Sequence, residues 1–448
     1  MKLELDDENL HRYLRVYHYY KELIETGKLK SDTKLPSIRK CATQLRMSRT
    51  TVETAYMMLA AEGYIISRPQ SGYYVARSLK TGNPAPFQAE KRQPFEPIIQ
   101  FDFASSNVDR NSFQFELWRR YVKSALRQDE RLLSYGEPQG ELELREALCD
   151  YLGRYRNVVS TPEHIVVGAG VQSLLHILCP MVKARREVTF YNPDFRQGRT
   201  VFEDHGFEIP GGSSSFASEE FPENSLFYLT PSQMTTWGSV MHITERMELI
   251  KTAFEKDVLI IEDDYNSEFK YYNRPTPSLQ GLAGGRNVVY LGTFSRLLLP
   301  SIRLSFMVLP PELLDVYKDR GRFYNQTASK AEQIALCQFI RDGHLESQIR
   351  KTRKLHVAKA KRLCEDINAI FGELAEAHMG EAGFLVMAEL HTSLTSEDIA
   401  LRAKKAGVAI RPLKQSPNPQ ILLSCSTVPA EQYEEALKRL KQAIFPEE

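Results

Sequence analysis

The sequence lacks long apolar runs and closely spaced cysteines, and these absences exclude several classes of protein. Its 448 residues contain no stretch of about 18 apolar residues, as a membrane-spanning helix needs, and no basic start followed by an apolar run. The cysteines form no C-x-x-C pair: Cys41, Cys149, Cys179, Cys337, Cys364 and Cys425. Scattered thiols are typical of a reducing compartment. We therefore expect a cytoplasmic protein with no membrane segment and no metal site.

The sequence also has little net charge, but its charge is unevenly distributed. The whole chain carries +1, with 58 Lys and Arg against 57 Asp and Glu. Residues 1–78 hold 13 Lys and Arg against 9 Asp and Glu, a difference of +4, so the remainder is about −3. A chain of this length favours two folded units, and the basic surplus indicates that the first unit binds a polyanion.

The first 78 residues have the pattern of three helices and a hairpin. Apolar residues at helical spacing over 9–26 predict one helix, and Ser37 and Ser48 are suitable amino-terminal caps for two more. The third helix buries a stripe that begins at Val52, so its first turn is exposed. Two β-prone runs then flank a turn that ends at Gly72. The order predicts a winged helix-turn-helix, whose third helix reads DNA.

This segment resembles the GntR-type winged helix through the motifs L-P-S-x-R, S-R-T-T-V, E-G-Y and G-Y-Y-V. The resemblance implies DNA contacts at the second helix, the start of the third helix and the wing: Arg39, Ser48, Arg49, Thr50, Thr51 and Gly72. Arg49 can form a bidentate pair with guanine, whereas Arg39 and the threonines suit phosphate. The alternative is a small helical interaction domain with a solvated charge run.

Residues 79–97 contain four prolines and little apolar periodicity, which predicts an extended, semi-stiff linker. Residues 98–448 then alternate β-prone runs with helical stretches. This alternation predicts an α/β domain with a mainly parallel sheet, whose ligand site lies at the carboxyl ends of the strands. Four candidate strand ends carry informative residues: Gly168-Ala-Gly-Val-Gln172, Pro231-Ser-Gln-Met234, Asp263-Asp-Tyr265 and Ser295-Arg296.

With Tyr135-Gly-Glu-Pro-Gln-Gly140 and Arg303, these segments resemble the fold-type I aminotransferase-like domain of the MocR subfamily of GntR regulators. The resemblance implies a head-to-tail homodimer with pyridoxal phosphate in the large domain. It also implies a role for each matching residue. Asp263 would pair with the pyridine nitrogen and Tyr265 would donate to the ring hydroxyl. Phosphate would be held by Gly170, Val171, Gln172, Ser295 and Arg303.

Several positions depart from the family pattern. Arg296 stands where the family has the lysine that binds the cofactor covalently. Gln233 stands in place of the usual histidine, and Phe195 in place of the tyrosine that stacks on the ring. Thr427 stands where an arginine would grip a carboxylate. A guanidinium offers no free amine to an aldehyde, so we predict that the domain is not an enzyme. Pyridoxal phosphate, if bound, would be held non-covalently.

The sequence therefore predicts a sequence-specific, DNA-binding transcription regulator. Its aminotransferase-like domain would act as a non-catalytic ligand-sensing and dimerisation module for a small-molecule effector of unknown identity. Two alternatives stay open. The regulator could use pyridoxal phosphate covalently through another lysine such as Lys270, or the chain could be an active aminotransferase with an accessory DNA-binding domain.

Overall fold

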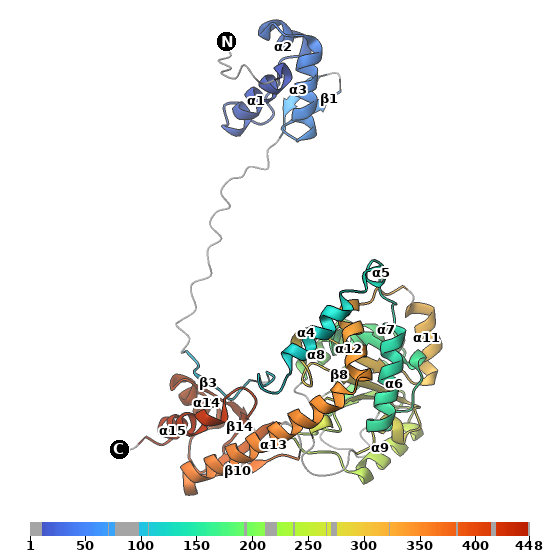
Figure 1. Cartoon of the computed structure of the whole chain (residues 1–448), viewed down its shortest axis with the longest axis vertical. Helices are drawn as coiled ribbons and strands as arrows, with labels where there is room; N and C mark the ends of the chain where they lie inside the picture. The colour runs from blue at the N-terminus through green and yellow to red at the C-terminus, as the bar shows by residue number, and fades with distance from the viewer. Residues whose placement is uncertain are drawn as a thin grey trace. The chain divides into compact units, whose positions relative to one another are not determined.

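A computed structural model describes residues 11–69, 71–76, 98–105, 107–191, 195–210, 222–235, 238–265, 267–269, 276–321, 323–381, 384–413 and 418–446. The chain divides into two compact units, Met1–Glu96 and Pro97–Glu448 (Figure 1). The predicted linker at 79–97 lies outside the described residues. No helix in these ranges is long and apolar enough to cross a membrane.

The small unit has the predicted winged helix-turn-helix fold. Its elements are α1 (Arg12–Glu25), α2 (Ile38–Leu45), α3 (Arg49–Ala61), β1 (Ile65–Arg68) and β2 (Gly72–Val75). The two strands pair antiparallel, with Arg68 opposite Gly72. The core forms because each helix places apolar residues at helical spacing on one side. Its buried members include Val16, Tyr20, Val52, Tyr56 and Leu59.

The large unit is built on a six-stranded sheet with the order β4-β9-β8-β7-β6-β5. The strands are β4 (Ile165–Gly168), β5 (Val188–Phe190), β6 (Leu226–Leu229), β7 (Leu259–Asp263), β8 (Val288–Thr293) and β9 (Ser305–Val308). The adjacent strands β5, β6, β7 and β8 are parallel to one another. The strand β9 is antiparallel to both β4 and β8. The mainly parallel sheet predicted from the sequence is therefore confirmed.

Helices cover both faces of this sheet because alternate strand residues point to opposite sides. On one face, Ile165 and Val167 pack with α4 (Phe115–Ala125), α6 (Leu142–Arg156) and α12 (Lys330–Arg341). On the other face, Val166 packs with α7 (Val171–Met181), α8 (Arg196–Asp204) and α11 (Pro311–Gly321). The helix α9 (Ile243–Glu255) and the short α10 (Leu279–Leu282) pack with β6, β7 and β8.

The helix α13 (His344–Phe371) runs from the six-stranded body to a smaller body at the carboxyl end (Figure 1). This body has a sheet of order β10-β11-β14-β13: Ala375–Met379, Leu385–Leu390, Gln420–Ser424 and Arg411–Leu413. The helices α14 (Ser396–Lys405) and α15 (Tyr433–Ile444) contribute to its core. A short parallel pair joins β3 (Phe101–Asp102) to β12 (Val408–Ala409).

The remaining short elements lie in connections. They are α5 (Asp129–Leu132) and the 3-10 turns Pro162–His164, Ser267–Phe269, Pro300–Ile302, Gly372–Leu374 and Ala430–Gln432.

Candidate functional site

The start of α3 presents the predicted DNA-contact residues on an exposed turn. The Ser48 side chain accepts a hydrogen bond of 3.1 Å from the backbone N–H of Thr51, which caps the helix. Its hydroxyl also lies 2.8 Å from the Thr50 hydroxyl. Arg49 is exposed and makes no ion pair with any residue that the structure describes. This turn can therefore offer a cation and hydroxyl groups to a nucleic acid.

The other two predicted DNA contacts lie on different elements. Arg39 is exposed in the first turn of α2. Gly72 begins β2 with a φ of +103°, a conformation that glycine adopts without strain. The wing also carries a cluster that was not predicted from the sequence. The Arg68 guanidinium lies 4.3 Å from the centre of the Tyr74 ring and 2.5 Å from Asp32. The period-two pattern of the two strands could have indicated that Arg68 and Tyr74 share a face.

In the large unit, Asp263 ends β7 and is buried, with 6% of its surface exposed. The Tyr228 hydroxyl donates a hydrogen bond of 2.6 Å to its Oδ2 atom. Its other oxygen, Oδ1, is buried without a hydrogen-bond partner. Burial raises the pKa of Asp263 to about 7, although the Tyr228 hydrogen bond and the charge of Arg296 act in the opposite direction.

This carboxylate suits the ring nitrogen of pyridoxal phosphate. A buried oxygen without a partner is costly, and a protonated pyridine nitrogen would satisfy Oδ1 and neutralise the carboxylate. Phe195 precedes α8 and stacks on Tyr228, with ring centres 5.5 Å apart and planes 28° apart. The predicted aromatic residue and the predicted carboxylate are thus both in contact with Tyr228. The donor set fits the cofactor at the ring.

The residues predicted to hold a phosphate at Gly170, Val171 and Gln172 lie at the start of α7. Gly170 has a φ of +100° and is the residue before the helix, so the amides of Val171 and Gln172 open its first turn. The Arg303 guanidinium lies against Gly170, where a Cβ atom would come within 2.4 Å of its Nη2 atom. Arg303 also donates a hydrogen bond of 3.3 Å to the Ala169 carbonyl oxygen. Amides and a cation therefore meet here, as a phosphate requires.

Two predicted phosphate residues have further contacts. The Gln172 side chain donates to the Gln197 carbonyl oxygen at 3.3 Å, so the side chain is directed towards α8. The Ser295 hydroxyl accepts a hydrogen bond of 3.2 Å from Thr293 and remains partly exposed just before Arg296. Gln233 is buried, and its backbone carbonyl accepts a 2.8 Å hydrogen bond from the Thr230 hydroxyl.

Arg296 is partly buried between two aromatic rings. Its guanidinium carbon lies 5.3 Å from the centre of the Tyr265 ring and 4.6 Å from the centre of the Phe384 ring. Burial lowers the pKa of Arg296 from its ordinary value, and the nearby positive charge of Arg411 acts in the same direction. Asp263 and Tyr265 oppose this change. Predicted residues from the ends of β7 and β8 thus interact with one another.

His356 and Arg411 come from distant parts of the chain and were not predicted from the sequence. His356 on α13 is 4% exposed, and both of its ring nitrogens lack a hydrogen-bond partner. Arg411 begins β13 and donates to the Ala104 carbonyl oxygen at 3.3 Å. Thr427, which stands where an arginine was expected, instead donates its hydroxyl to the Asp102 carbonyl oxygen.

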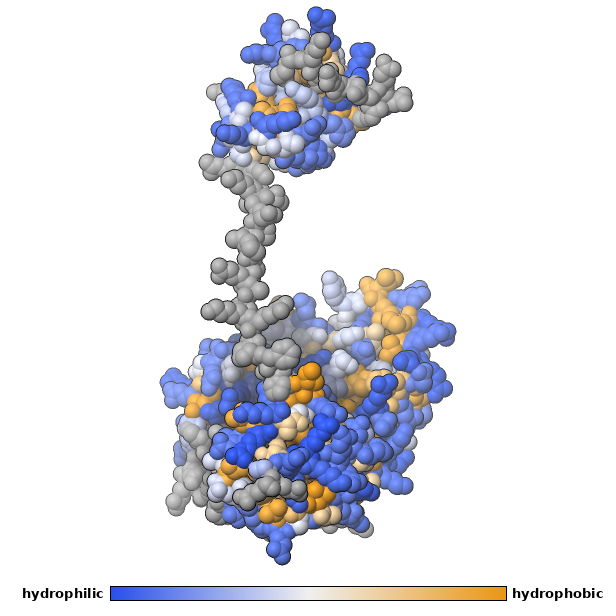
Figure 2. Space-filling model, turned by 90° about the vertical axis from the view of Figure 1, so that its left-hand side faces the viewer, coloured by the Kyte–Doolittle hydropathy of each residue, from blue (hydrophilic) through white to orange (hydrophobic). Residues whose placement is uncertain are grey.

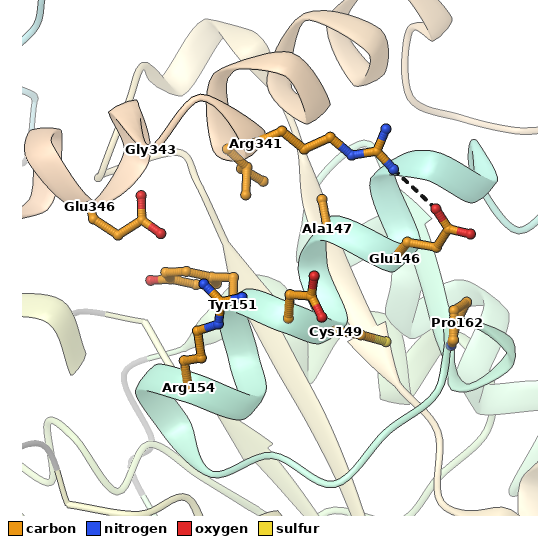
Figure 3. A pocket seen from close by; sticks show the side chains of 11 residues that line it. Glu146, Ala147, Cys149, Tyr151, Arg154, Pro162, Arg341, Gly343 and Glu346 are labelled. Carbon is orange, nitrogen blue, oxygen red and sulfur yellow. Dashed lines mark hydrogen bonds and ion pairs between the residues drawn. The ribbon is translucent and has the colours of Figure 1, made fainter.

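A separate cavity of about 550 Å³ lies between α6 and the junction of α12 with α13 (Figure 3). The Arg341 guanidinium pairs with Glu146 across it at 3.0 Å. None of the predicted DNA or cofactor residues lines this cavity. Within the described ranges, no group of three or more His, Cys, Asp or Glu side chains is arranged to hold a metal ion.

Two protein families match the chain. The family of bacterial regulatory proteins called gntR matches residues 12–75, and aminotransferase class I and II matches residues 98–440. The solved structure of Pyrococcus horikoshii kynurenine aminotransferase superposes with a TM-score of 0.65 at 21% identity, over 78% of this chain and 91% of that one. This similarity confirms the predicted fold-type I aminotransferase architecture of the large unit.

Whole-length relatives are regulators. The HTH-type transcriptional regulator YdeL of Bacillus subtilis (strain 168) is 35% identical over 450 residues, which cover 96% of each chain. The probable rhizopine catabolism regulatory protein MocR of Rhizobium meliloti is 29% identical over 475 residues, which cover 98% of this chain and 94% of MocR. This chain therefore belongs to the HTH-type transcriptional regulators that join a GntR winged helix to an aminotransferase class I and II domain, and it is close to the MocR-type regulators.

Proposed function

We propose that the large unit of this regulator binds an aromatic phosphate of the pyridoxal phosphate type without a covalent bond and without transamination. The observation that carries the proposal is Arg296. It stands where the resemblance expects the lysine that attacks the aldehyde. Its delocalised guanidinium is a poor nucleophile, so binding and sensing are the functions that remain.

The ring and phosphate positions support retention of such a ligand. Asp263 would take the ring nitrogen through its unpartnered Oδ1 atom, and Phe195 would cover the ring. Arg303 and the amides after Gly170 would take the phosphate. In enzymes of this fold, pyridoxal phosphate serves as an electron sink. Here the chain's own residues would only bind and orient the molecule.

We also propose that Arg49 and its neighbours read an operator in double-stranded DNA. The support is the exposed amino-terminal turn of α3, which Ser48 caps. In this turn the Arg49 side chain is exposed and forms no ion pair with a described carboxylate. Arg39 and the wing would contact the backbone. The six cysteines are free thiols, as is typical of proteins in a reducing compartment such as the cytoplasm.

A homodimer is the third part of the proposal. Large apolar side chains are exposed directly after α5, where Leu133 is 89% exposed and Tyr135 100%. Figure 2 shows hydrophobic surface at the top of the large unit, at the height of α5 in Figure 1. An exposed apolar patch favours burial against a partner, and a second copy would pair two DNA-binding domains. The head-to-tail arrangement stays a proposal from resemblance.

The ligand would act by changing the population of two arrangements of the dimer. It can shift that equilibrium only by the difference between its affinities for the two arrangements. The ligand would contact both the six-stranded body and the smaller carboxyl-terminal body. If these bodies move, its affinity would differ between the two arrangements. Arg296 belongs to the first body and Phe384 to the second, and the guanidinium carbon of Arg296 lies 4.6 Å from the centre of the Phe384 ring.

A titration with pyridoxal phosphate tests the proposal directly. Purified protein is titrated while its visible absorption is recorded, then desalted and treated with borohydride. A retained chromophore that borohydride does not attach to the protein is the expected result. Covalent attachment would support the alternative in which another lysine acts; Lys270 lies outside the described residues. Turnover with any amino donor would instead establish an aminotransferase. The absence of any bound chromophore would contradict pyridoxal phosphate binding.

A further inference from the structure

The positive charge of Arg296 forms no ion pair with a described carboxylate, although Asp263 acts on it electrostatically. Among the residues that the structure describes, no carboxylate oxygen lies within 4.0 Å of the Arg296 nitrogens, and no acceptor is hydrogen-bonded to its N–H groups. Arg296 is only partly buried, so part of its side chain is in contact with solvent. A partly buried cation of this kind is unfavourable unless something else pairs with it.

The aromatic contacts of Arg296 do not use its hydrogen-bonding groups. Tyr265 and Phe384 attract the charge of the guanidinium through their ring electrons. None of the five N–H groups is hydrogen-bonded to a residue within the described ranges, and together they form a planar fork that matches the two oxygens of a carboxylate. The rings hold this fork in place, which reduces the entropy lost when an anion binds.

Two further groups add hydrogen-bond donors on the Arg296 side of the proposed ligand site. Arg411 acts electrostatically on Arg296, and its guanidinium donates to the Ala104 carbonyl oxygen at 3.3 Å. His356 has its ring centre 5.7 Å from that of Phe384, and neither ring nitrogen has a partner. Burial lowers the pKa of His356 to about 4, so it is a neutral donor and acceptor at pH 7. The opposite polarity lies at Asp263, an acceptor with a free oxygen.

We infer that Arg296 recognises an anionic oxygen group of the ligand, and that the pocket prefers a carboxylate where pyridoxal phosphate has its aldehyde. This inference rests on the proposed function and narrows its ligand class. The ligand would present a protonated ring nitrogen to Asp263, a phosphate to Arg303 and a carboxylate to the fork of Arg296. The replacement of lysine by arginine would then be a change of specificity, from an aldehyde that reacts to a carboxylate that is bound.

Four pyridine phosphates that differ only at this group provide the test. They carry a carboxylate, an aldehyde, an alcohol or an ammonium group, as in 4-pyridoxic acid 5′-phosphate, pyridoxal 5′-phosphate, pyridoxine 5′-phosphate and pyridoxamine 5′-phosphate. Calorimetric titration of the full-length protein should rank the carboxylate first and the ammonium last. We expect the carboxylate to bind at least about tenfold more tightly than the alcohol, as a charge-assisted bidentate pair provides.

Two variants separate recognition from packing. Arg296→Met has similar length but no charge, so it should lose about tenfold for the carboxylate and change little for the neutral alcohol. Arg296→Lys restores the charge without the fork and should give an intermediate affinity for the carboxylate. A residue that only supports the fold would change the affinity of all four compounds equally.

The outcomes distinguish this inference from the proposed function. Binding without preference, or preference for the ammonium compound, would overturn the inference and leave non-covalent phosphate binding intact. If none of the four compounds binds, the proposed function is wrong, and pyridine-4-carboxylate becomes the probe. A rise in melting temperature with this compound in the wild type but not in Arg296→Met would support anion recognition by Arg296. No rise would overturn the inference as well.

Discussion

The Tyr228 hydroxyl donates to Oδ2 of Asp263 at 2.6 Å, while Oδ1 of the same carboxylate has no partner. The protein therefore fixes one oxygen of this carboxylate, whereas the other makes no hydrogen bond. The tyrosine limits the orientation of the carboxylate because it is fully buried beside it.

Asp263→Asn should change how stability depends on pH. Burial raises the pKa of Asp263 to about 7, against about 3.9 in an unfolded chain. The folded wild type thus binds more protons than the unfolded chain between about pH 4 and pH 7, so its stability falls as pH rises through this range. Asparagine has no proton to lose and can still accept from Tyr228. At pH 8 the variant should be more stable by up to about 4 kcal/mol.

Calorimetric melting of both proteins at pH 5 and pH 8 checks this expectation. The gap between their melting temperatures should widen towards pH 8 in favour of the variant. The same variant should bind pyridine phosphates more weakly, because it offers no charge to the ring nitrogen. Parallel melting profiles at the two pH values would contradict a raised pKa for Asp263.

Arg49→Ala should weaken binding to a specific operator by about 1–3 kcal/mol, the contribution of a bidentate contact to guanine. Arg49 is exposed, so the variant should fold normally. Fluorescence anisotropy measures the affinity for operator DNA and for unrelated DNA. Arg402→Ala on α14 is the control, since Arg402 is also an exposed arginine. Equal loss of affinity for both DNAs would show that Arg49 binds phosphate instead of a base.

Ser48→Ala should destabilise the small unit by about 0.5–2 kcal/mol, because the amide of Thr51 loses its capping partner. Chemical unfolding monitored for the winged helix would measure this loss. Ser67→Ala, at an exposed position of β1, is the matched control and should change stability little. If both variants unfold alike, the cap contributes nothing beyond an ordinary surface serine.

Gly170→Ala should reduce phosphate affinity more than it reduces stability. The new methyl group would meet the Arg303 guanidinium at 2.4 Å and displace it, and a φ of +100° is strained for alanine. We expect the strain to cost about 1–3 kcal/mol. Gly206→Ala is the control, since its φ is +80° and nothing lies within 4 Å of the added atom.

Calorimetric titration with pyridoxal phosphate should therefore show weaker binding in Gly170→Ala alone. If the two glycine variants bind pyridoxal phosphate with equal affinity, Arg303 does not contribute to phosphate binding.

Leu133→Asp should disrupt the proposed homodimer. Leu133 is 89% exposed, so a charge there costs nothing in an isolated chain but opposes burial in an apolar interface. Sedimentation equilibrium should show more monomer in the variant. Leu401→Asp on α14 replaces another exposed leucine and should leave the oligomeric state unchanged. A monomeric wild type would contradict the dimer directly.

Much of the fold and part of the site could be predicted from local patterns. Ser37 and Ser48 mark helix starts because a side-chain oxygen there satisfies free amides nearby in the sequence. Gly170 and Asp263 follow β-prone runs, and strand ends in such sheets meet at one edge. The direction of β9 could not be predicted, since a strand buried on both faces has the same apolar pattern in either direction.

The sequence by itself determined the two kinds of unit, the exposed turn at Arg49 and the arginine at position 296. Only the tertiary structure decided what surrounds that arginine. Tyr265, Phe384, His356 and Arg411 come from four separate elements, and no local periodicity relates them. The physical reason is that short-range hydrogen bonds and side-chain spacing fix helices and strands, whereas the partners of a buried charge depend on how distant segments pack.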